Sequence, residues 1–313
     1  MNILITGGCG YKGTVLVPKL LNKGHSITVI DPQWFGNFLK PHPSLVVEKN
    51  SVRNVLPEKL KRFDAIIHLA SVANDPCSDL DPKLTWEISC LETMQLADSA
   101  ARAEVKHFIY ASSGSVYGVS EEPDVVESLP LNPISEYNKT KMCAERILLS
   151  YADNMIVQIV RPATVCGLSP RMRLDVAVNL LAMQALEKGV ITVLGGDQVR
   201  PNIHIDDITD LYEFLIDSPN ITGVFNAGFE NISIKEIANM VVSEIGGDIV
   251  FKPSNDPRSY RVNSDKLLAT GFTPKKNVAS AIREIKIAYN EKTLSNEDKF
   301  HNLKWMKKTM YAN

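Results

Sequence analysis

The chain lacks the features that would place it in a bilayer, on nucleic acid or in a disulfide framework. No apolar run approaches the length that a membrane-spanning helix needs. Acidic and basic residues are interspersed, so no basic stripe indicates nucleic acid or an anionic membrane. The cysteines are scattered without paired spacing, which argues against disulfides and a zinc motif. They are Cys9, Cys77, Cys90, Cys143 and Cys166.

The N-terminal stretch MNILITGG also lacks the charged region and cleavage site of a secretion signal, and it enters an apolar strand pattern at once. We therefore expect a cytoplasmic protein with reduced thiols. The 313 residues are 44% hydrophobic and 22% charged, with a formal net charge of -2 and a pI of about 6.3. This is enough chain for a substantial core, either as one large domain or as two lobes.

Short apolar runs alternate with longer amphipathic stretches in the first half of the chain. The strand-like runs are 3–6, 26–30, 44–48, 65–70, 106–112 and 155–160. The helix-like stretches are 15–24, 84–103 and 141–152. Apolar strands that alternate with helices indicate an α/β fold, with a parallel, doubly wound sheet covered on both faces.

After Arg161 this rhythm loosens, and Gly and Pro become frequent. Helix-like stretches at 175–189, 232–246 and 277–290 stand among short strands, which predicts a smaller α/β lobe. We expect this lobe, residues 161–313, to bind the substrate, with some of its segments returning to the main sheet. The polar segment 294–308 suggests a terminal helix or arm, and its sequence gives no role.

A glycine-rich turn, TGGCGYKG, lies between the first strand and the first helix. Gly7, Gly10 and Gly13 can make the tight turn, admit a diphosphate to the backbone and let helix and strand pack closely. The helix N-terminus favours the same diphosphate. Asp31 ends the second strand, where an acid accepts hydrogen bonds from ribose hydroxyls and repels a 2′-phosphate. These features predict an NAD-binding Rossmann-type domain over residues 1–160.

Tyr137 and Lys141 stand four residues apart where a helical pattern begins, so both project from one face. Of the nine tyrosines, this is the only one followed by Lys at the fourth place. Alone the pair fits an ordinary helix surface as well as a tyrosine that moves protons. Its significance depends on the motifs around it.

Taken together in order, the motifs resemble those of the extended short-chain dehydrogenase/reductase family, in its nucleotide-sugar epimerase/dehydratase branch, which includes UDP-glucose 4-epimerase. The motifs are TGGCGYKG, Asp31, HLAS (68–71), SSGSVYG (112–118), Tyr137 with Lys141, RPATVCG (161–167), RPNIHIDD (200–207) and Arg258. The resemblance covers nearly the whole chain. It implies NAD across the carboxyl ends of the strands, a nucleoside-diphosphate sugar on the second lobe, and a homodimer through the helices of 84–103 and 141–152.

The resemblance also implies roles for three residues. Tyr137 exchanges a proton with a sugar hydroxyl while hydride passes to or from the nicotinamide. Lys141 lowers the pKa of Tyr137 and holds the nicotinamide ribose, since a nearby cation favours the phenolate over the phenol. Ser113 hydrogen-bonds the same sugar oxygen.

The remaining site residues follow from the same resemblance. Cofactor contacts are expected from Gly7, Gly10, Tyr11, Lys12, Gly13, Asp31, Ser51, Val52, Leu69, Ala70, Ser71, Tyr137, Lys141 and Pro162. Substrate contacts are expected from Ser115, Arg171, Arg173, Asn179, Arg200 and Arg258, because the guanidinium fork suits phosphate oxygens.

Not all of these assignments carry equal weight. Charges that precede a helix, as Arg171 and Arg173 do, are often solvated. Segment 72–76 is expected to line the sugar pocket. No second His or Cys stands at metal spacing from His204, so we expect His204 to be structural and the protein to bind no metal.

Three departures from the family pattern are informative. Gly114 and Ser115 occupy the places where family dehydratases carry an Asp-Glu pair, and 4,6-dehydration needs an acid and a base beside the tyrosine. The sequence therefore argues against a 4,6-dehydratase. Lys12 replaces an apolar residue of the glycine turn, and Ser51 stands where an Asp commonly contacts adenine.

The leading functional prediction is an NAD-dependent nucleotide-sugar 4-epimerase that acts through a transient 4-keto sugar. The alternative is a C4 dehydrogenase or 4-keto reductase with a net change of redox state, which shares the same half-reaction. A non-catalytic protein that senses NAD(H) on the same fold is a third hypothesis. The sequence does not identify the nucleotide or the sugar.

Overall fold

The computed structural model describes residues 1–311 apart from 121 and 255–258. Its centre is a seven-stranded sheet, all parallel, in the order β10-β6-β5-β4-β1-β2-β3. Its strands are β1 (Asn2–Thr6), β2 (Ser26–Asp31), β3 (Leu45–Lys49), β4 (Ala65–His68), β5 (His107–Ala111), β6 (Ile156–Pro162) and β10 (Gly223–Ala227). The predicted Rossmann-type, doubly wound fold is confirmed.

The helices follow the predicted alternation. The α-helices are α1 (Gly13–Asn22), α2 (Pro57–Leu60), α3 (Asp75–Leu80), α4 (Pro82–Trp86), α5 (Glu92–Arg102), α6 (Glu136–Leu149), α7 (Ala177–Lys188), α8 (Ile205–Ile216), α9 (Ile234–Ile245), α10 (Asp265–Leu268), α11 (Val278–Asn290) and α12 (Asn302–Met310). The other helical segments are η1 (Val52–Asn54), η2 (Glu87–Leu91), η3 (Gly114–Tyr117) and η4 (Asp298–Phe300).

One predicted helix differs in detail. The sequence indicates a continuous helix over 84–103, whereas the structure divides it into α4, the π-helical η2 and α5. Inside η2 the Ser89 hydroxyl accepts a hydrogen bond from the backbone N–H of Val72, at 3.1 Å. A π-helical turn widens the helix by one residue, and such turns concentrate near functional sites. Here it ties the helix to the segment that follows β4.

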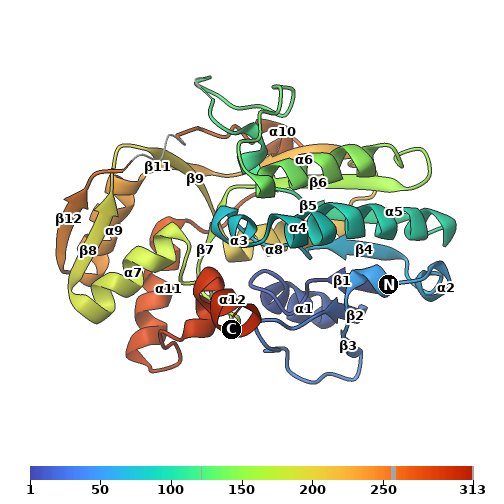
Figure 1. The fold of residues 1–313 in the computed structure, drawn as a ribbon, viewed down its shortest axis with the longest axis horizontal. Coiled ribbons are helices and arrows are strands. Elements are labelled where there is room, and N and C mark those ends of the chain that lie inside the picture. Colours follow the sequence, from blue (N-terminus) through green and yellow to red (C-terminus); the bar gives the residue numbers. More distant parts are fainter. Residues whose placement is uncertain (121, 255–258, 312–313) are drawn as a thin grey trace.

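Helices cover both faces of the sheet because successive strand residues point to opposite sides. From β1, Ile3 and Ile5 pack into the core that includes α1 and α8. Leu4 packs into the core that includes α5 and α6, on the opposite face. Figure 1 shows α5 and α6 running side by side along the sheet.

Two small sheets lie beyond β6 along the chain. One contains β11 (Glu230–Ser233), β9 (Val199–His204) and β7 (Thr164–Cys166), and the other contains β12 (Asp248–Lys252) and β8 (Val190–Leu194). Helices α7 and α9 pack with the second of these at one end of the molecule (Figure 1). The boundary at residue 160 between two lobes stays a prediction, since β10 lies in the large sheet beside β6.

Across the described ranges, no helix combines the length and the apolarity that crossing a bilayer requires. The strand order reverses direction between β1 and β4, which pair with each other in the middle of the sheet. In open α/β sheets, the crevice at the carboxyl ends of the strands beside such a reversal is where ligands bind.

Candidate active site

A cavity of about 720 Å³ opens at this edge of the sheet. It is lined by all fourteen predicted cofactor residues and by Ser113, Ser115, Arg171, Arg173 and Arg200. Segments 73–76 and 162–165 form further parts of its wall. The residues chosen from scattered motifs therefore converge on one space, large enough for a dinucleotide and part of a second ligand.

The glycine turn forms the floor of the cavity. Gly7 has φ of +71°, and a Cβ atom there would stand 2.6 Å from the backbone nitrogen of Ala70. A Cβ on Gly13 would stand 2.3 Å from the carbonyl oxygen of Gly8, so this glycine permits the close approach of turn and helix. Gly10 has space on its cavity side, with its nearest neighbour at 3.2 Å from a built Cβ. The turn thus leaves bare backbone at the N-terminus of α1, which suits a diphosphate.

Asp31 stands at one end of the cavity, at the end of β2. Its two carboxylate oxygens accept hydrogen bonds from the backbone N–H groups of Gln33 (2.7 Å) and Cys9 (3.0 Å). Burial raises the pKa of Asp31, and these two hydrogen bonds lower it. The carboxylate is held rigidly, and each oxygen retains a lone pair for a ribose hydroxyl.

The expected adenine contacts lie near the same end. The Ser51 hydroxyl donates to the carboxylate of Glu92, at 2.9 and 3.0 Å, and accepts from the N–H of Arg53. Glu92 also lines the cavity, which the sequence did not predict. Ser51 therefore reaches the cavity as part of a small polar group together with the carboxylate of Glu92.

Tyr137, the predicted catalytic residue, stands at the other end of the cavity, in the first turn of α6, where Ser135 caps the helix. Burial raises the pKa of Tyr137, the hydrogen-bonding hydroxyl of Ser113 lowers it, Asp75 raises it and Arg173 lowers it. The phenol is therefore the protonated form at neutral pH in the ligand-free protein. A tyrosine whose pKa depends on four identifiable influences is a candidate for proton transfer.

Ser113 and Ser115 join Tyr137 through a chain of hydroxyl groups. Their Oγ atoms lie 2.7 Å apart, and Ser115 Oγ donates to Asn138 Oδ1 at 2.5 Å. Between them, Gly114 begins η3 and contributes no side chain. A Cβ on Gly114 would stand 3.2 Å from the carbonyl oxygen of Pro162, so the position is closely packed.

Lys141 is almost completely buried, with 2% of its surface exposed. Its ammonium donates to the carbonyl oxygen of Ala111 at 2.7 Å and lies 4.8 Å from the centre of the Tyr110 ring. Burial and the charge of Lys12 lower the pKa of Lys141 well below its ordinary value, and Glu145 raises it. The carbonyl of Ala111 fixes the ammonium at 6.0 Å from the centre of the Tyr137 ring.

Lys12 brings a second cation to this end. Its ammonium lies 3.5 Å from the Tyr212 hydroxyl, and no carboxylate within the described residues is at ion-pair distance from it. Burial and repulsion from Arg173 lower the pKa of Lys12 to about 8. A positive wall of this kind favours anionic ligands.

Arg171, Arg173 and Arg200 all line the cavity. Arg173 pairs with Asp175 at 3.0 Å. Arg258, also predicted to bind the substrate, lies outside the described residues. Arg171 and Arg173 are buried or nearly so, rather than solvated as charges before a helix often are.

Asn179 is not among the residues that line this cavity, and its predicted contact with a diphosphate stays a prediction. Its Oδ1 accepts from the N–H of Gly167 at 3.0 Å, and its Nδ2 donates to the Tyr11 hydroxyl and the carbonyl oxygen of Arg173. Both the oxygen and the nitrogen of the Asn179 amide therefore have hydrogen-bond partners within the protein. Asn179 thereby links Tyr11 to the backbone at Gly167 and Arg173.

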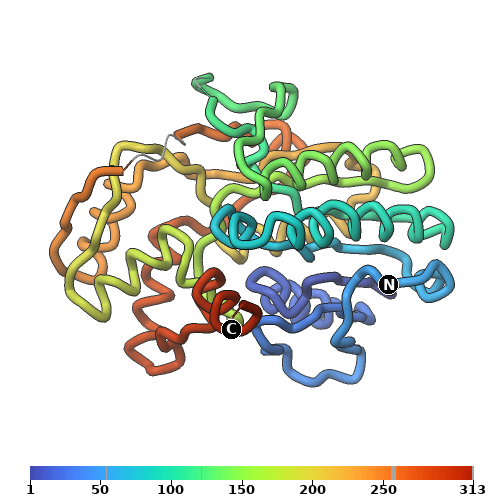
Figure 2. The backbone as a smooth tube through the Cα atoms, viewed as in Figure 1, coloured from blue at the N-terminus to red at the C-terminus, as the bar shows by residue number. Residues whose placement is uncertain are grey.

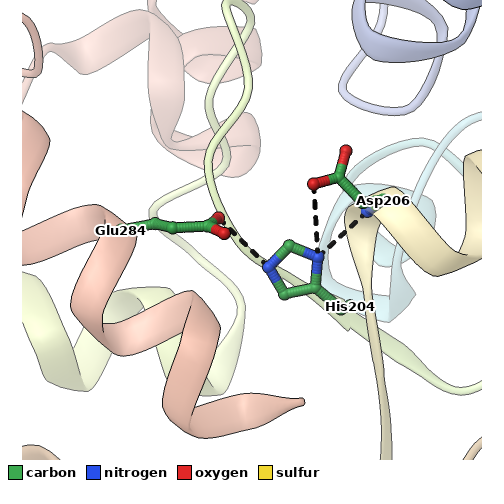
Figure 3. Close-up of side chains that lie close together, drawn as sticks. All are labelled: His204, Asp206 and Glu284. Atoms are coloured by element: carbon green, nitrogen blue, oxygen red, sulfur yellow. Dashed lines mark hydrogen bonds and ion pairs between the residues drawn. The ribbon is translucent and has the colours of Figure 1, made fainter. Parts of the chain in front are cut away.

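Within the described part of the chain, one group of side chains has the spacing of metal ligands: His204, Asp206 and Glu284, shown in Figure 3. His204 Nε2 lies 3.1 Å from the Glu284 carboxylate, and His204 Nδ1 accepts from the N–H of Asp206. The ammonium of Lys276 lies 2.6 Å from both carboxylates. The cluster therefore already contains its cation, which agrees with a structural role for His204.

The sequence analysis missed other parts of the wall besides Glu92. Trp34 and Phe35 come three and four residues after Asp31, and only their position after β2 could have suggested them. Asn302 comes from the C-terminal segment and belongs to no recognised motif. Neighbours in space that are distant in sequence leave no local signal.

Comparison with known proteins finds similarity to nucleotide-sugar epimerases. A UDP-glucose 4-epimerase of Lactobacillus helveticus is 27% identical, over 88% of this chain and 92% of that protein. An uncharacterized UDP-glucose epimerase of Bacillus subtilis is 30% identical, over 77% and 81%. A solved UDP-glucuronic acid 4-epimerase from Bacillus cereus, in complex with UDP-glucuronic acid and NAD, is 26% identical with a TM-score of 0.81, over 92% and 100%.

A family model supplies the classification. The model described as the NAD dependent epimerase/dehydratase family matches residues 3–228, well over half of the chain. This range contains the glycine turn, Asp31, Ser113 and the pair of Tyr137 and Lys141. The chain belongs to the NAD dependent epimerase/dehydratase family, whose cofactor is NAD.

Proposed function

We propose that this protein is a nucleotide-sugar 4-epimerase that uses NAD and acts through a transient 4-keto sugar. The observation that carries the proposal is the convergence of Ser113, Tyr137 and Lys141 with the glycine turn and Asp31 on one cavity. The curated relatives named above as epimerases support the same conclusion.

The residues present fit the cofactor. The glycine turn leaves bare backbone where a Cβ would intrude, and Gly10 has no side chain on the cavity side. Asp31 offers fixed carboxylate oxygens for ribose hydroxyls. Lys141 keeps N–H donors for a second ribose, since a lysine ammonium carries three and Ala111 uses one. When bound, NAD supplies a hydride acceptor and donor at C4 of the sugar.

The protein residues handle the proton. In its phenolate form, Tyr137 takes the proton from the C4 hydroxyl as the C4 hydride leaves, so that the C4–O bond becomes a carbonyl. Ser113 donates a hydrogen bond to the same oxygen and holds it near the phenol. The 4-keto sugar then presents its other face, hydride returns to C4, and Tyr137 returns the proton to the oxygen. No net oxidation results.

The cations of the second lobe suit a nucleoside-diphosphate substrate. Arg173 and Arg200 lie on the cavity wall, and guanidinium groups match phosphate oxygens through parallel N–H donors. We assign no 4,6-dehydratase activity, because Gly114 has no side chain and Ser115 carries a hydroxyl in place of a carboxylate.

The decisive experiment incubates the purified protein and NAD with a panel of nucleoside-diphosphate sugars. Reduced-nicotinamide absorbance and the NMR spectrum of the sugar are followed together. An epimerase produces a C4 stereoisomer while absorbance stays flat. A rise of NADH in step with a keto sugar would instead identify a C4 dehydrogenase, the alternative that uses the same residues.

Tyr137→Phe provides the matched control, because it removes one oxygen atom. We expect turnover to fall by about a thousandfold, in the range for loss of a general base, while NAD binding persists. Turnover that survives this change would disprove the proposed role of Tyr137. A protein that binds NAD and converts no sugar would support the third hypothesis, an NAD(H)-sensing protein.

A further inference from the structure

The C-terminal helix α12 contributes its first residue, Asn302, to the cavity wall. Trp305 Nε1 donates to the backbone carbonyl of Trp34 at 2.7 Å. Met306 is buried in a small core with Val72 and Cys77. Figure 2 shows this C-terminal helix packed beside the helix that begins at Asp75, close to the centre of the molecule. The tail, whose role the sequence left open, therefore closes one side of the site.

Asn302, the first residue of α12, contacts Arg171 and the carboxylate that pairs with Arg173. It is 3% exposed, and its Oδ1 accepts from the guanidinium of Arg171 at 2.6 Å. Its backbone N–H donates to Asp175 Oδ2 at 3.1 Å. The other oxygen of Asp175 pairs with Arg173. One residue thus fixes Arg171 directly and Arg173 through a carboxylate.

Arg171 is a buried cation without a neutralising carboxylate. It is 2% exposed, and its guanidinium lies 4.1 Å from the centre of the Phe35 ring. Among the described residues no acid lies at ion-pair distance, and its Nε donor has no hydrogen-bond partner. A buried cation without a counter-charge destabilises the protein. A bound anion with oxygen acceptors would supply both the counter-charge and a hydrogen-bond partner for Nε.

The position of Arg171 selects the ligand. Its backbone N–H donates to Thr14 Oγ1 at 3.4 Å, so the backbone of Arg171 lies beside the first turn of α1, which follows the glycine turn. Its guanidinium lies over the ring of Phe35, four residues after Asp31 at the end of β2. Burial and the charge of Arg173 lower the pKa of Arg171 to about 9, while Asp175 and Asp31 raise it. Arg171 therefore faces the diphosphate side of the cofactor site.

We propose that Arg171 binds the diphosphate of the cofactor and that Asn302 positions its guanidinium for this contact. The sequence analysis expected Arg171 to contact the substrate, whereas this proposal assigns it to NAD. The inference rests on the cofactor part of the proposed function. Its test measures binding alone, so it fails or holds whichever sugar the enzyme converts.

The test is an NMR titration of the cofactor-free protein with adenosine, ADP and UDP. Arg171→Met removes the cation and keeps an unbranched side chain. We expect its affinity for ADP to fall ten- to a hundredfold, the range for a charged hydrogen bond, with adenosine binding unchanged. Arg173→Met is the comparison, and it should leave ADP binding in place.

Asn302→Ala tests the positioning role. It should lower the affinity for ADP several-fold and leave the affinity for adenosine unchanged. In the Arg171→Met background it should cause no further loss of ADP affinity. Lys307→Met, on the exposed side of α12, is the matched control and should change neither affinity. Thermal unfolding checks that each variant is folded. If Asn302→Ala does not fold, the Arg171→Met comparison still decides the main claim.

Three results would overturn the inference. Equal losses of affinity for adenosine and for ADP in Arg171→Met would mean that the arginine supports only the fold. Loss of UDP affinity with unchanged ADP affinity would mean that Arg171 binds the substrate and not the cofactor. A further loss from Asn302→Ala in the Arg171→Met background would show that Asn302 acts by another route.

Discussion

The ammonium of Lys141 lies 6.0 Å from the centre of the Tyr137 ring, while its hydrogen bond goes to the carbonyl oxygen of Ala111. The sequence-based prediction was that Lys141 would lower the pKa of Tyr137. In this structure Ser113 and Arg173 lower it. The proposed function assigns the remaining N–H donors of Lys141 to a ribose hydroxyl, and Arg173 is the cation that acts on the Tyr137 phenol.

This arrangement predicts opposite pH shifts for two variants. Arg173→Met removes a charge that lowers the pKa of Tyr137, so that pKa rises and the acidic limb of the kcat/KM profile moves to higher pH. Asp75→Asn removes a charge that raises the same pKa, so the limb moves to lower pH. The measurement is kcat/KM against pH for wild type and both variants. Superimposable acidic limbs would contradict these electrostatic roles.

The glycine turn allows a cofactor effect to be separated from a folding effect. In Gly10→Ala the new methyl group would meet only the carbonyl oxygen of Gly7, at 3.2 Å, so the fold should persist. The methyl group would stand where the diphosphate approaches, and NAD affinity should fall by about tenfold or more. Calorimetric titration measures the affinity and thermal unfolding measures stability.

Two further glycine variants serve as controls. Gly7→Ala should lose stability as well, because φ is +71° and the methyl group would stand 2.6 Å from the Ala70 nitrogen. Gly24→Ala, with φ of +84° and open space around it, should lose about 1 kcal/mol of stability and keep NAD affinity. Unchanged NAD binding in Gly10→Ala would argue against a diphosphate over this turn.

The sequence identified what depends on local patterns. Buried strands carry continuous apolar runs, such as Ile3–Ile5, because helices cover both faces of the sheet. The glycine turn and the spacing of Tyr137 and Lys141 are also local, because each lies within a few consecutive residues. These patterns sufficed for the fold and for the residues that converge on the cavity.

The sequence failed where contacts join distant segments. The bond from Arg171 to Asn302 spans 131 positions, and no spacing rule could have revealed it. The amide of Asn179 contacts Gly167, 12 positions away, and Tyr11, 168 positions away, and no local pattern announces the second contact. The choice between two hydrogen-bonding directions for one side chain depends on tertiary packing, which a single sequence does not contain.

The buried ion pair of Glu145 and Arg161 should contribute strongly to the stability of the protein around α6. Arg161 donates to both carboxylate oxygens, with a shortest distance of 2.7 Å, and Ser112 donates to the same carboxylate. Glu145→Ala leaves Arg161 buried without its partner, so the free energy of unfolding should fall by roughly 3–5 kcal/mol. Urea denaturation measures this.

The double variant Glu145→Leu with Arg161→Met completes the test. It removes both charges together, and we expect it to recover most of the lost stability. A double-mutant cycle gives the coupling between the two side chains. If the double variant is as unstable as Glu145→Ala, the loss comes from packing around the helix and not from the unpaired charge.

His68 should make stability depend on pH. It is fully buried between Thr6 and Thr93, and burial, reinforced by the charge of Lys141, lowers its pKa from 6.5 to about 3. The unfolded chain binds a proton that the folded protein excludes. The contribution of neutral His68 is therefore complete above pH 6.5 and is lost progressively as the pH falls toward 3.

At about pH 5 this group alone should have removed roughly 2 kcal/mol from the free energy of unfolding. His68→Gln should flatten the pH dependence of urea denaturation over this interval, whatever its effect on stability at neutral pH. The exposed His42→Gln is the control and should leave the slope unchanged. An unchanged slope in His68→Gln would mean that other groups control acid stability.

The homodimer expected from the family resemblance has a candidate surface. Trp86, Leu91 and Met94 are 36%, 41% and 42% exposed and border one shallow depression on the segment that contains η2. If this surface pairs with a second copy, Leu91→Glu with Met94→Glu should give a monomer, because unpaired carboxylates would be buried. Light scattering measures the mass, and Leu268→Glu, an exposed change on α10, should leave it unaltered. A wild-type monomer at working concentration would remove the prediction, and a dimer that survives the double change would place the interface elsewhere.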